Sequence, residues 1–396
     1  MSRRIRLTVL MTHPIQYYSP WFRFIEERAK EIQLHVLYLT EPSPEQQGVG
    51  FGEGFQWDLP LRAGYENQLL RESRPEDSFA SGSFWSLNVA HLEEKLERTS
   101  PDVVLLSGWH SLMQFRGIWA CRRRGLPVLY RGDTNLDARS AGLADALWRM
   151  RTRWLLQRFT RYLSVGTKAH QYLRTFGVRE ELIFDSPHAV DNDLFARGAS
   201  PFLETEAWET ARRDWQLSPS EFVVLFVGKL EPKKRLEDLV RAAALARQET
   251  RLLIVGRGPC EETCYRLASQ LGVRASWIGF LNQTKLARAY AVADCLALPS
   301  GKGETWGLVV NEAMATGLPC VVSDLVGCGP DLIEPDRTGY IFRAGSVEGL
   351  ARSLARMRTL RETGTFRREW CLEKAGTHSF EAATEGLVAA CVSAIV

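Results

Sequence analysis

The sequence of 396 residues has no hydrophobic run long enough to cross a membrane. Its longest apolar stretches, such as 223–228 and 102–108, have only the length of a strand. It also has little excess charge, because 50 Lys and Arg against 47 Asp and Glu leave a formal net charge of +3. This near balance argues against nucleic acid as the main partner. With 45% hydrophobic and 24% charged residues, the composition excludes a disordered chain and a repeat array.

The cysteines lack the pairing that a zinc site needs. The eight are scattered, and Cys260 and Cys264 have no second Cys or His pair at metal spacing. We therefore expect free, mostly buried thiols, as in a protein of the reducing cytoplasm. Basic residues open the chain before an apolar stretch, but that stretch is short and runs into His13 and Pro14 without a small-residue cleavage site. We expect a buried first strand there, not a signal peptide.

Strand-like and helix-like segments alternate along the whole chain. Short β-branched runs predict twelve strands, at 6–12, 34–40, 102–107, 127–132, 161–166, 182–187, 223–228, 252–256, 276–280, 295–300, 320–324 and 339–342. Amphipathic patterns between most of them predict helices, for example at 20–31, 111–124 and 143–158. This alternation predicts an α/β fold with parallel sheets covered on both faces.

The length and the repeated pattern predict two doubly wound, Rossmann-like domains that face a central cleft. We place the first at 1–200 and the second at 201–375, with a linker in 198–220, where no strand character occurs. An amphipathic helix in 376–396 is expected to pack back on the first domain. Ligands bind at the carboxyl ends of strands in such sheets, so the residues directly after the strands are the functional candidates.

Four cations follow the first strand of the second half. Lys229, Lys233, Lys234 and Arg235 lie within seven residues after Gly228, where a buried strand gives way to a helix. A helix start beside Lys and Arg forms an anion site, and a diphosphate is the obvious biological anion. Taken alone, the segment could also be a solvated basic helix start.

A glycine-rich loop with a carboxylate follows the strand at 295–300, and a short helix carries a second carboxylate. Gly307 allows the backbone to approach a ligand closely. Free N–H groups at the helix start, those of Gly307, Leu308 and Val309, would face the same anion as the lysines. A carboxylate placed on a diphosphate would repel it, so we expect Glu312 to accept hydrogen bonds from sugar hydroxyls, such as those of a ribose.

These segments resemble the retaining GT-B glycosyltransferases of family 4, which include sucrose- and glycan-synthesising enzymes. Their signature has two glutamates eight apart in E-x-[FW]-G-L-x-x-x-E, and it is matched by Glu304, Trp306, Gly307, Leu308 and Glu312. The similarity extends to 227–234, to 293–300 and to the helix after Asp331, so it covers most of 180–345. In the first half, the motif at 12–17 and the segment 57–61 resemble one bacterial branch of the family.

The resemblance implies roles for these residues. Glu312 would hold the donor ribose, Glu304 would lie against the transferred sugar, and Lys229 and Lys234 would neutralise the diphosphate. The predicted donor site is completed by Gly228, Thr305, Trp306, Gly307, Leu308 and Val309. The chain departs from the family at two places. At the first, the family often has Arg where this chain has Lys229, and a lysine ammonium is a point charge that lacks the two parallel N–H donors of a guanidinium. The family's first-domain glycine loop is also absent, and 13–16 stands in its place.

The first half supplies three further candidates. His110 follows the strand at 102–107, where this family often places a histidine that contacts the donor sugar; alone, it would be a structural histidine. Arg131 and Asp133 follow the next strand and either bind the acceptor or close the domain through an ion pair. His13 also lies at the predicted cleft.

Residues 147–161 carry five arginines and no acidic residue among Trp, Leu and Phe. This pattern predicts either a membrane-surface helix for a lipid-linked acceptor or a domain helix with a solvated basic face. We expect a cytoplasmic protein, with contact to the inner membrane surface as the further option.

The sequence thus predicts a retaining, hexosyltransferase-type enzyme that moves a sugar from a nucleotide-diphosphate sugar to an unknown acceptor hydroxyl. The nucleotide-sugar is a substrate, and we expect no cofactor and no metal. The main alternative is a non-catalytic relative that binds a nucleotide-sugar or a partner protein; a phosphorylase or an epimerase on the same fold is less favoured. An NAD-type oxidoreductase is disfavoured because Gly256-Arg257-Gly258 lacks the third glycine, where Glu261 stands.

Overall fold

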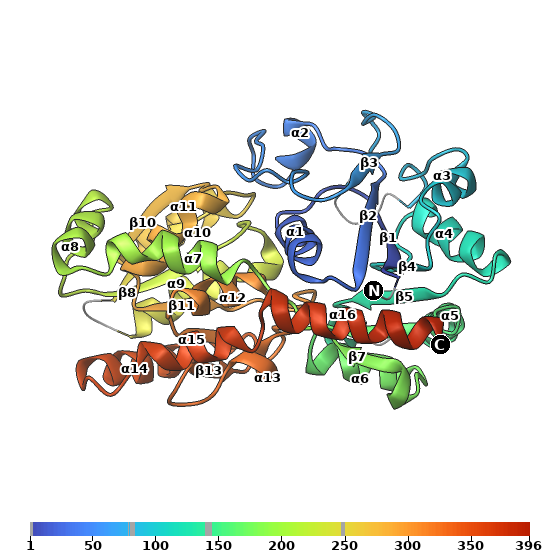
Figure 1. Cartoon of the computed structure of the whole chain (residues 1–396). Helices are drawn as coiled ribbons and strands as arrows, with labels where there is room; N and C mark the ends of the chain where they lie inside the picture. Colours follow the sequence, from blue (N-terminus) through green and yellow to red (C-terminus); the bar gives the residue numbers. More distant parts are fainter. Residues whose placement is uncertain (1–2, 78, 80–83, 139–144, 247–249) are drawn as a thin grey trace.

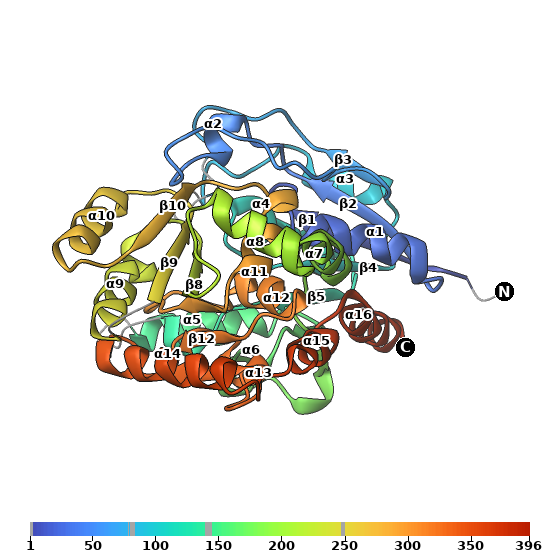
Figure 2. The same cartoon turned by 90° about the vertical axis from the view of Figure 1, so that its left-hand side faces the viewer.

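The computed structural model describes residues 3–77, 79, 84–138, 145–246 and 250–396. Two parallel sheets lie side by side, each with helices against it, and form two lobes (Figures 1 and 2). The first sheet has seven strands in the order β3-β2-β1-β4-β5-β6-β7. Its strands are β1 (Ile5–Met11), β2 (Ile32–Tyr38), β3 (Asn67–Leu69), β4 (Val103–Leu106), β5 (Val128–Gly132), β6 (Arg161–Ser164) and β7 (Ile183–Asp185).

The second sheet has six strands in the order β10-β9-β8-β11-β12-β13. Its strands are β8 (Phe222–Val227), β9 (Thr250–Val255), β10 (Ala275–Gly279), β11 (Cys295–Leu298), β12 (Cys320–Ser323) and β13 (Gly339–Phe342). In each sheet the strand order reverses once, between β1 and β4 and between β8 and β11. A doubly wound sheet opens a crevice at such a point, beyond the carboxyl ends of the strands.

The predicted strands are confirmed to within two residues at either end. Strands such as β8 are recognisable because both faces are covered by helices, and all six of its residues are buried. The sequence prediction missed β3, which has only three residues, is polar and lies at the sheet edge. An edge strand of this length carries no apolar run that a sequence pattern could reveal.

Helices lie on both faces of the sheets. Those of the first 190 residues are α1 (Tyr18–Arg28), α2 (Pro44–Gln47), α3 (Leu92–Arg98), α4 (Leu112–Arg123), α5 (Asp145–Leu156) and α6 (Thr167–Thr175). Those that follow are α7 (Asn192–Ala199), α8 (Thr205–Asp214), α9 (Leu236–Leu245), α10 (Glu261–Gln270), α11 (Gln283–Val292), α12 (Leu308–Ala315), α13 (Gly329–Leu332), α14 (Val347–Glu362), α15 (Arg368–Gly376) and α16 (Phe380–Ile395). Residues 143–144 of the predicted helix 143–158 lie outside the described residues.

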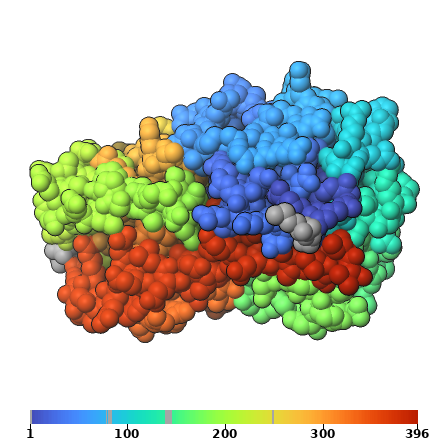
Figure 3. Space-filling model, viewed as in Figure 1, coloured from blue at the N-terminus to red at the C-terminus, as the bar shows by residue number. Residues whose placement is uncertain are grey.

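The chain crosses between the lobes twice. It passes to the second lobe before α7, and α16 brings it back to pack on β6 and β7 (Figure 1). Figure 3 shows the surface of the C-terminal residues running without a break beneath both lobes. The two crossings touch, because Asn192 Nδ2 donates hydrogen bonds to the carbonyl oxygens of Ala375 (3.0 Å) and His378 (3.5 Å). The domain limits given above remain a prediction.

The predicted linker 198–220 contains regular structure. Helix α8 lies within it and packs on α11, and Arg212 is fully buried, with its guanidinium donating to Asp294 Oδ2 (2.8 Å). The segment lacks strand character, as expected, but the sequence analysis predicted no helix in it. All eight cysteines are free thiols, and seven are buried. Within the described ranges, no helix is both long and apolar enough to cross a bilayer.

Candidate active site between the two lobes

The candidate site is built on loops that leave the two sheets where the strand orders reverse. In the second lobe, β8 leads into Gly228 and β11 leads into Ser300. Gly228 has a φ of +147°, a backbone conformation that side chains rarely adopt, and a Cβ atom there would lie 3.7 Å from Lys234 Cε. The backbone conformation, rather than a lack of space, therefore favours glycine at this position.

Glu304 and Lys234 form an ion pair at the centre of the second-lobe part. Lys234 Nζ donates to Glu304 Oε2 at 2.5 Å, and Ser300 Oγ donates to the same oxygen at 2.8 Å. The two charged side chains are only 12% and 11% exposed. Burial favours the neutral acid, but the charge and hydrogen bond of Lys234 outweigh it and lower the pKa of Glu304. The carboxylate is therefore held as an anion.

Glu312 lies in a different environment. It is fully buried, and its carboxylate accepts hydrogen bonds from the hydroxyls of Tyr17 (3.0 Å) and Tyr290 (2.5 Å). Burial raises the pKa of Glu312 to about 7, although the hydrogen bonds from the two tyrosines oppose that rise. Tyr17 belongs to the first lobe and lies 295 residues away, so this bond joins the two lobes.

Lys229 is covered by a segment of the first lobe. Its Nζ donates to the carbonyl oxygen of Val49 at 2.8 Å and lies 4.7 Å from the centre of the Phe51 ring. Burial lowers the pKa of this lysine. We call residues 48–58 the covering segment, because they lie over the lysine that was predicted to bind diphosphate.

The covering segment is attached to the second lobe at three more points. Phe55 packs on Phe280, with ring centres 4.3 Å apart. The Asp58 carboxylate accepts from the hydroxyl and the backbone N–H of Thr284, in the first turn of α11. Asn282 Nδ2 donates to the carbonyl oxygen of Gln56 at 2.7 Å. A first-lobe carboxylate thus caps a second-lobe helix.

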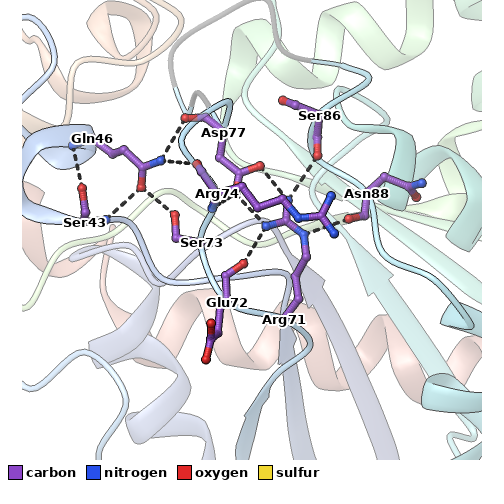
Figure 4. Close-up of polar contacts among 9 residues, drawn as sticks. All are labelled: Ser43, Gln46, Arg71, Glu72, Ser73, Arg74, Asp77, Ser86 and Asn88. Carbon is purple, nitrogen blue, oxygen red and sulfur yellow. Dashed lines mark hydrogen bonds and ion pairs between the residues drawn. The ribbon is translucent and has the colours of Figure 1, made fainter.

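A polar network fixes the loop that carries the covering segment (Figure 4). The Arg71 guanidinium donates two hydrogen bonds to the buried Asp77 carboxylate, of 2.7 Å to Oδ2 and 2.6 Å to Oδ1. Gln46 Nε2 donates to the carbonyl oxygens of Arg74 (2.7 Å) and Asp77 (3.3 Å), while its Oε1 accepts from Ser73 Oγ (2.6 Å). Bidentate and buried contacts of this kind hold the base of the loop in one conformation.

The start of α12 also contacts the first lobe. Gly307 caps the helix with a φ of +101°, and a Cβ there would lie 2.9 Å from Leu298 Cδ2. Thr305 Oγ1 donates to Asp133 Oδ2 at 2.6 Å. The Trp306 ring is buried, and its Nε1 donates to Asn311 Oδ1 at 2.9 Å. Leu308 and Val309 form the first turn, where N–H groups have no partner within the helix.

Arg131 is held inside the first lobe. Its buried guanidinium donates to the Tyr18 hydroxyl (3.0 Å) and to the carbonyl oxygens of Ser186 and Pro187 (3.1 Å each). It also lies 4.5 Å from the centre of the Trp21 ring. These contacts tie the end of β5 to the turn before α7.

The two first-lobe histidine candidates have contacts of modest strength. His110 is exposed, stacks on Trp109 with ring centres 6.1 Å apart, and has a lowered pKa because of desolvation by its neighbours. His13 Nδ1 lies 2.9 Å from Thr12 Oγ1, and burial lowers the pKa of His13 to about 4. In the described part of the chain, these contacts and those of Arg131 stay within the first lobe. Asp133 is the candidate that reaches across.

Sequence reasoning missed several members of the site. Tyr17 is the last residue of the motif at 12–17, but the sequence analysis assigned it no role. Ser300 is the last residue of the predicted strand 295–300, and it was not predicted to contact the site. Tyr290 lies on α11 among buried apolar residues, so its pattern is that of a core residue. The covering segment acts through the carbonyl oxygen of Val49, which has no side-chain signature.

Three comparisons place these observations among known proteins. Residues 208–368 match a family model described as glycosyl transferases group 1. The chain is 35% identical over 254 residues to a GDP-mannose-dependent alpha-mannosyltransferase of Mycobacterium tuberculosis, across 63% of this chain and 62% of that protein. It is 31% identical over 215 residues to the sulfoquinovosyl transferase SQD2 of Arabidopsis thaliana, across 50% and 41%. The matched part therefore spans less than two thirds of each relative.

Solved structures cover the chain more completely at lower identity. HepE of Anabaena in complex with UDP superposes with a TM-score of 0.71 at 15% identity, over 99% of this chain and 100% of that one. A glycosyltransferase from Rickettsia africae gives a TM-score of 0.73 at 12% identity, over 100% and 99%. The predicted fold of two Rossmann-like units, the GT-B architecture, is confirmed.

Proposed function

Because the chain belongs to the family of group 1 glycosyltransferases (GT4), we propose that it is a retaining glycosyltransferase. It would move a sugar, as a hexosyltransferase, from a nucleotide-diphosphate sugar to an acceptor hydroxyl. The observation that carries this proposal is the group formed by Lys234, Glu304 and Ser300 at the ends of β8 and β11, beside the start of α12. It combines a cation for phosphate with an anion that can accept from sugar hydroxyls.

In the proposed reaction the bond between the anomeric carbon and the diphosphate oxygen breaks, and its electrons stay on the diphosphate. Lys229, Lys234 and the first N–H groups of α12 stabilise that charge. The acceptor oxygen bonds to the anomeric carbon from the same face, and its proton passes to the departing phosphate oxygen. No separate base is needed for this step.

Donor binding would exchange contacts inside the site. Phosphate oxygens would take the place of the Val49 carbonyl at Lys229, and a ribose hydroxyl would replace that of Tyr17 at Glu312. Both replacements keep the kind of partner. Lys229 would still donate to an oxygen acceptor, and Glu312 would still accept from a hydroxyl group. Glu304 would stay in place and accept from the transferred sugar. Thr305, Trp306, Gly307, Leu308, Val309 and Gly228 would shape the donor pocket.

The partners and the place of action follow as parts of the same proposal. We propose that residues 1–200 receive the acceptor, that residues 201–375 bind the donor, and that the enzyme works in the cytoplasm, with 147–161 as the contact to the inner membrane surface. We propose that no divalent metal is needed. An Asp-x-Asp triplet does occur at 191–193, but Asp191 caps α7 by accepting from Leu194 N at 2.8 Å.

A panel of UDP-, GDP-, ADP- and dTDP-sugars tests the proposal through the release of free nucleoside diphosphate, with and without EDTA. The Glu304→Gln and Lys234→Ala variants run beside Glu262→Gln, a matched control on the exposed face of α10. We expect one donor to be consumed, the two site variants to lose turnover and the control to keep it. Donor binding without turnover would favour the non-catalytic alternative. Neither binding nor turnover with any donor would overturn the proposal.

A further inference from the structure

Trp306 has its backbone in the glycine-rich loop after β11 and its side chain in the hinge, where the two chain crossings meet. We call that loop, residues 301–307, the donor loop. The indole is only 3% exposed, and its ring centre lies 5.5 Å from that of His188 and 5.8 Å from that of His378. His188 stands just before α7, in the first crossing, and His378 lies between α15 and α16, in the second. One side chain therefore contacts both connections between the lobes.

The space around the indole fits a large ring closely. Gly166, which caps α6 in the first lobe, would place a Cβ atom 2.4 Å from Trp306 Cζ3, so a larger residue there would collide with the ring. Trp306 Nε1 donates to Asn311 Oδ1 at 2.9 Å, and Asn311 Nδ2 donates to the carbonyl oxygen of His188 at 3.0 Å. Asn311 is 1% exposed, so a buried amide with partners on both sides connects the indole to the hinge.

The turn that carries His188 belongs to the first lobe. The backbone N–H of His188 donates to the carbonyl oxygen of Val165 at 3.0 Å, directly after β6. The buried Arg131 guanidinium donates to the carbonyl oxygens of the two residues before His188. Helix α12, which carries Asn311, lies between α7 and α15 of the second lobe and packs on both (Figures 1 and 2). The bond from Asn311 to His188 therefore joins the two lobes at the hinge.

Two sets of contacts hold the donor loop. From the second lobe, the Cys328 N–H donates to the Trp306 carbonyl oxygen at 3.0 Å. From the first lobe and the hinge, Asp133 Oδ2 accepts from Thr305 Oγ1 at 2.6 Å, and the hinge encloses the indole. A rotation of the lobes displaces only the second set, so it either tilts the loop or breaks these contacts. Glu304, the residue before Thr305, moves with the loop.

We propose that Trp306 and Asn311 are positioning residues that link the hinge to the donor loop. Through them the angle between the lobes sets the place of Glu304 relative to Lys234, so the pair is assembled at one lobe angle. The indole and the amide both face the hinge, and they act on the site through the backbone of the loop. This inference rests on the proposed function, in which Glu304 accepts from the transferred sugar.

Hydrogen exchange of two variants tests the link from its two ends. Trp306→Phe keeps a buried ring but removes the indole N–H, and His378→Ala removes a ring from the second crossing without changing the loop. We expect the backbone amides of 301–307 to exchange about fivefold faster in each, the effect of losing one buried hydrogen bond or ring contact. The double variant should exchange no faster than the faster single one, because both changes break one chain of contacts. Matched controls, which should exchange like the wild type, are partly buried residues away from the hinge: Trp277→Phe on β10 and His35→Ala on β2.

The reverse change gives an independent measurement, because coupling between two sites is reciprocal. Lys234→Ala releases Glu304 and should shift the indole N–H resonance of Trp306, which is identified by its absence in Trp306→Phe. Lys285→Ala, an exposed lysine on α11, is the matched control and should leave this resonance in place. A ring that only fills space at the hinge would not respond to a change at Lys234.

Turnover distinguishes this inference from the proposed function. We expect kcat of Trp306→Phe for release of nucleoside diphosphate to fall by about tenfold to a hundredfold, the effect of misplacing a catalytic group by about 1 Å. If the wild type consumes no donor, the proposed function fails. The exchange and resonance measurements then still decide whether the link exists, because neither needs a donor.

Four outcomes would overturn the link. They are unchanged loop exchange in both single variants, additive acceleration in the double variant, acceleration that extends equally to β8, and an unmoved Trp306 resonance in Lys234→Ala. Equal acceleration in β8 would mean a general loss of stability instead of a local connection. Thermal melts show whether each variant is folded, and if Trp306→Phe does not fold, His378→Ala and Lys234→Ala carry the test.

Discussion

Glu304 and Glu312 lie eight residues apart in one glycine-rich segment, yet the structure gives them opposite surroundings. Glu304 is paired with the Lys234 ammonium and its pKa is lowered; Glu312 is bonded to two phenols and its pKa is raised to about 7. The partners of Glu304 come from its own lobe. One partner of Glu312, Tyr17, comes from the other lobe.

The difference shows that the identity of a side chain does not set its charge; its partners do. Both carboxylates are nearly removed from water, which by itself favours the neutral acid. A cation at 2.5 Å reverses that preference for Glu304, whereas hydroxyl donors only reduce it for Glu312. Glu304 therefore keeps its charge throughout the neutral range, whereas the charge of Glu312 depends on pH in that range.

The largest expected effect comes from removing the cation on which the comparison rests. Lys234→Ala leaves Glu304 as an unpaired buried anion and takes a charge from the leaving diphosphate. We expect kcat to fall on the order of a hundredfold to a thousandfold in the donor-consumption assay. Lys285→Ala, an exposed lysine on α11, is the matched control. A Lys234→Ala enzyme within twofold of the wild type would remove Lys234 from the leaving-group site.

The second prediction uses pH to separate the two carboxylates. The pKa of Glu312 is about 7 when folded against 4.5 ordinarily, so the folded state binds more protons than the unfolded state between these values. The free energy of unfolding contributed by this group therefore falls as pH rises from 4.5 to 7, by on the order of 3 kcal/mol. Glu312→Gln should remove that fall. Urea denaturation of both proteins at pH 5 and pH 8 measures it, and identical pH dependence in the two would contradict the assignment.

The third prediction separates the two phenols at Glu312. Tyr17→Phe removes the hydroxyl that we propose the donor ribose replaces, so donor binding should tighten by about fivefold, the worth of one hydrogen bond. Tyr290→Phe removes a donor from the same lobe, which a ribose hydroxyl does not displace, and should not tighten binding. Calorimetric titration of the donor into each variant measures both. If Tyr17→Phe weakened donor binding, Tyr17 would be part of the donor site instead of a competitor for it.

The smallest expected effect is at the edge of the covering segment. Asp58→Asn weakens the cap that the first lobe places on α11 and leaves both glutamates untouched. We expect hydrogen exchange of the Thr284 amide to accelerate by about twofold to fivefold, the range of a weakened exposed cap. Exchange in α12 should stay as in the wild type. Faster exchange in α12 as well would mean that the Glu312 contact and the Asp58 contact open as one unit.

The fold was largely predictable from the sequence because it repeats one local pattern. Each long buried strand, such as β8, is a run of apolar residues that depends on neither its partner strands nor the site. The short β3 was not predicted, since its three residues carry no apolar run. The helix α8 is amphipathic, but the segment around it was assigned as a linker because it lacks strand character. Pairing with β2 defines β3, and packing on α11 holds α8 in place.

The second-lobe part of the site was predictable for a related reason. Lys229, Lys234, Glu304 and Glu312 lie in two short contiguous motifs, so their residue types and spacing can be recognised along the chain. The first-lobe part arises from contacts between residues 170 or more positions apart, such as Asn135 with Thr305 and Val49 with Lys229. No local pattern contains them, and the Val49 contact uses a backbone carbonyl that any residue could supply.

The two chain crossings between the lobes have a mechanical consequence. Asn192 fastens one crossing to the other, so the lobes are joined at two adjacent points of one line. Two lobes joined at two points can rotate about the line through these points, whereas translation and rotation about other axes are restrained. The contacts of Tyr17 with Glu312 and of Val49 with Lys229 would then part in a single swing.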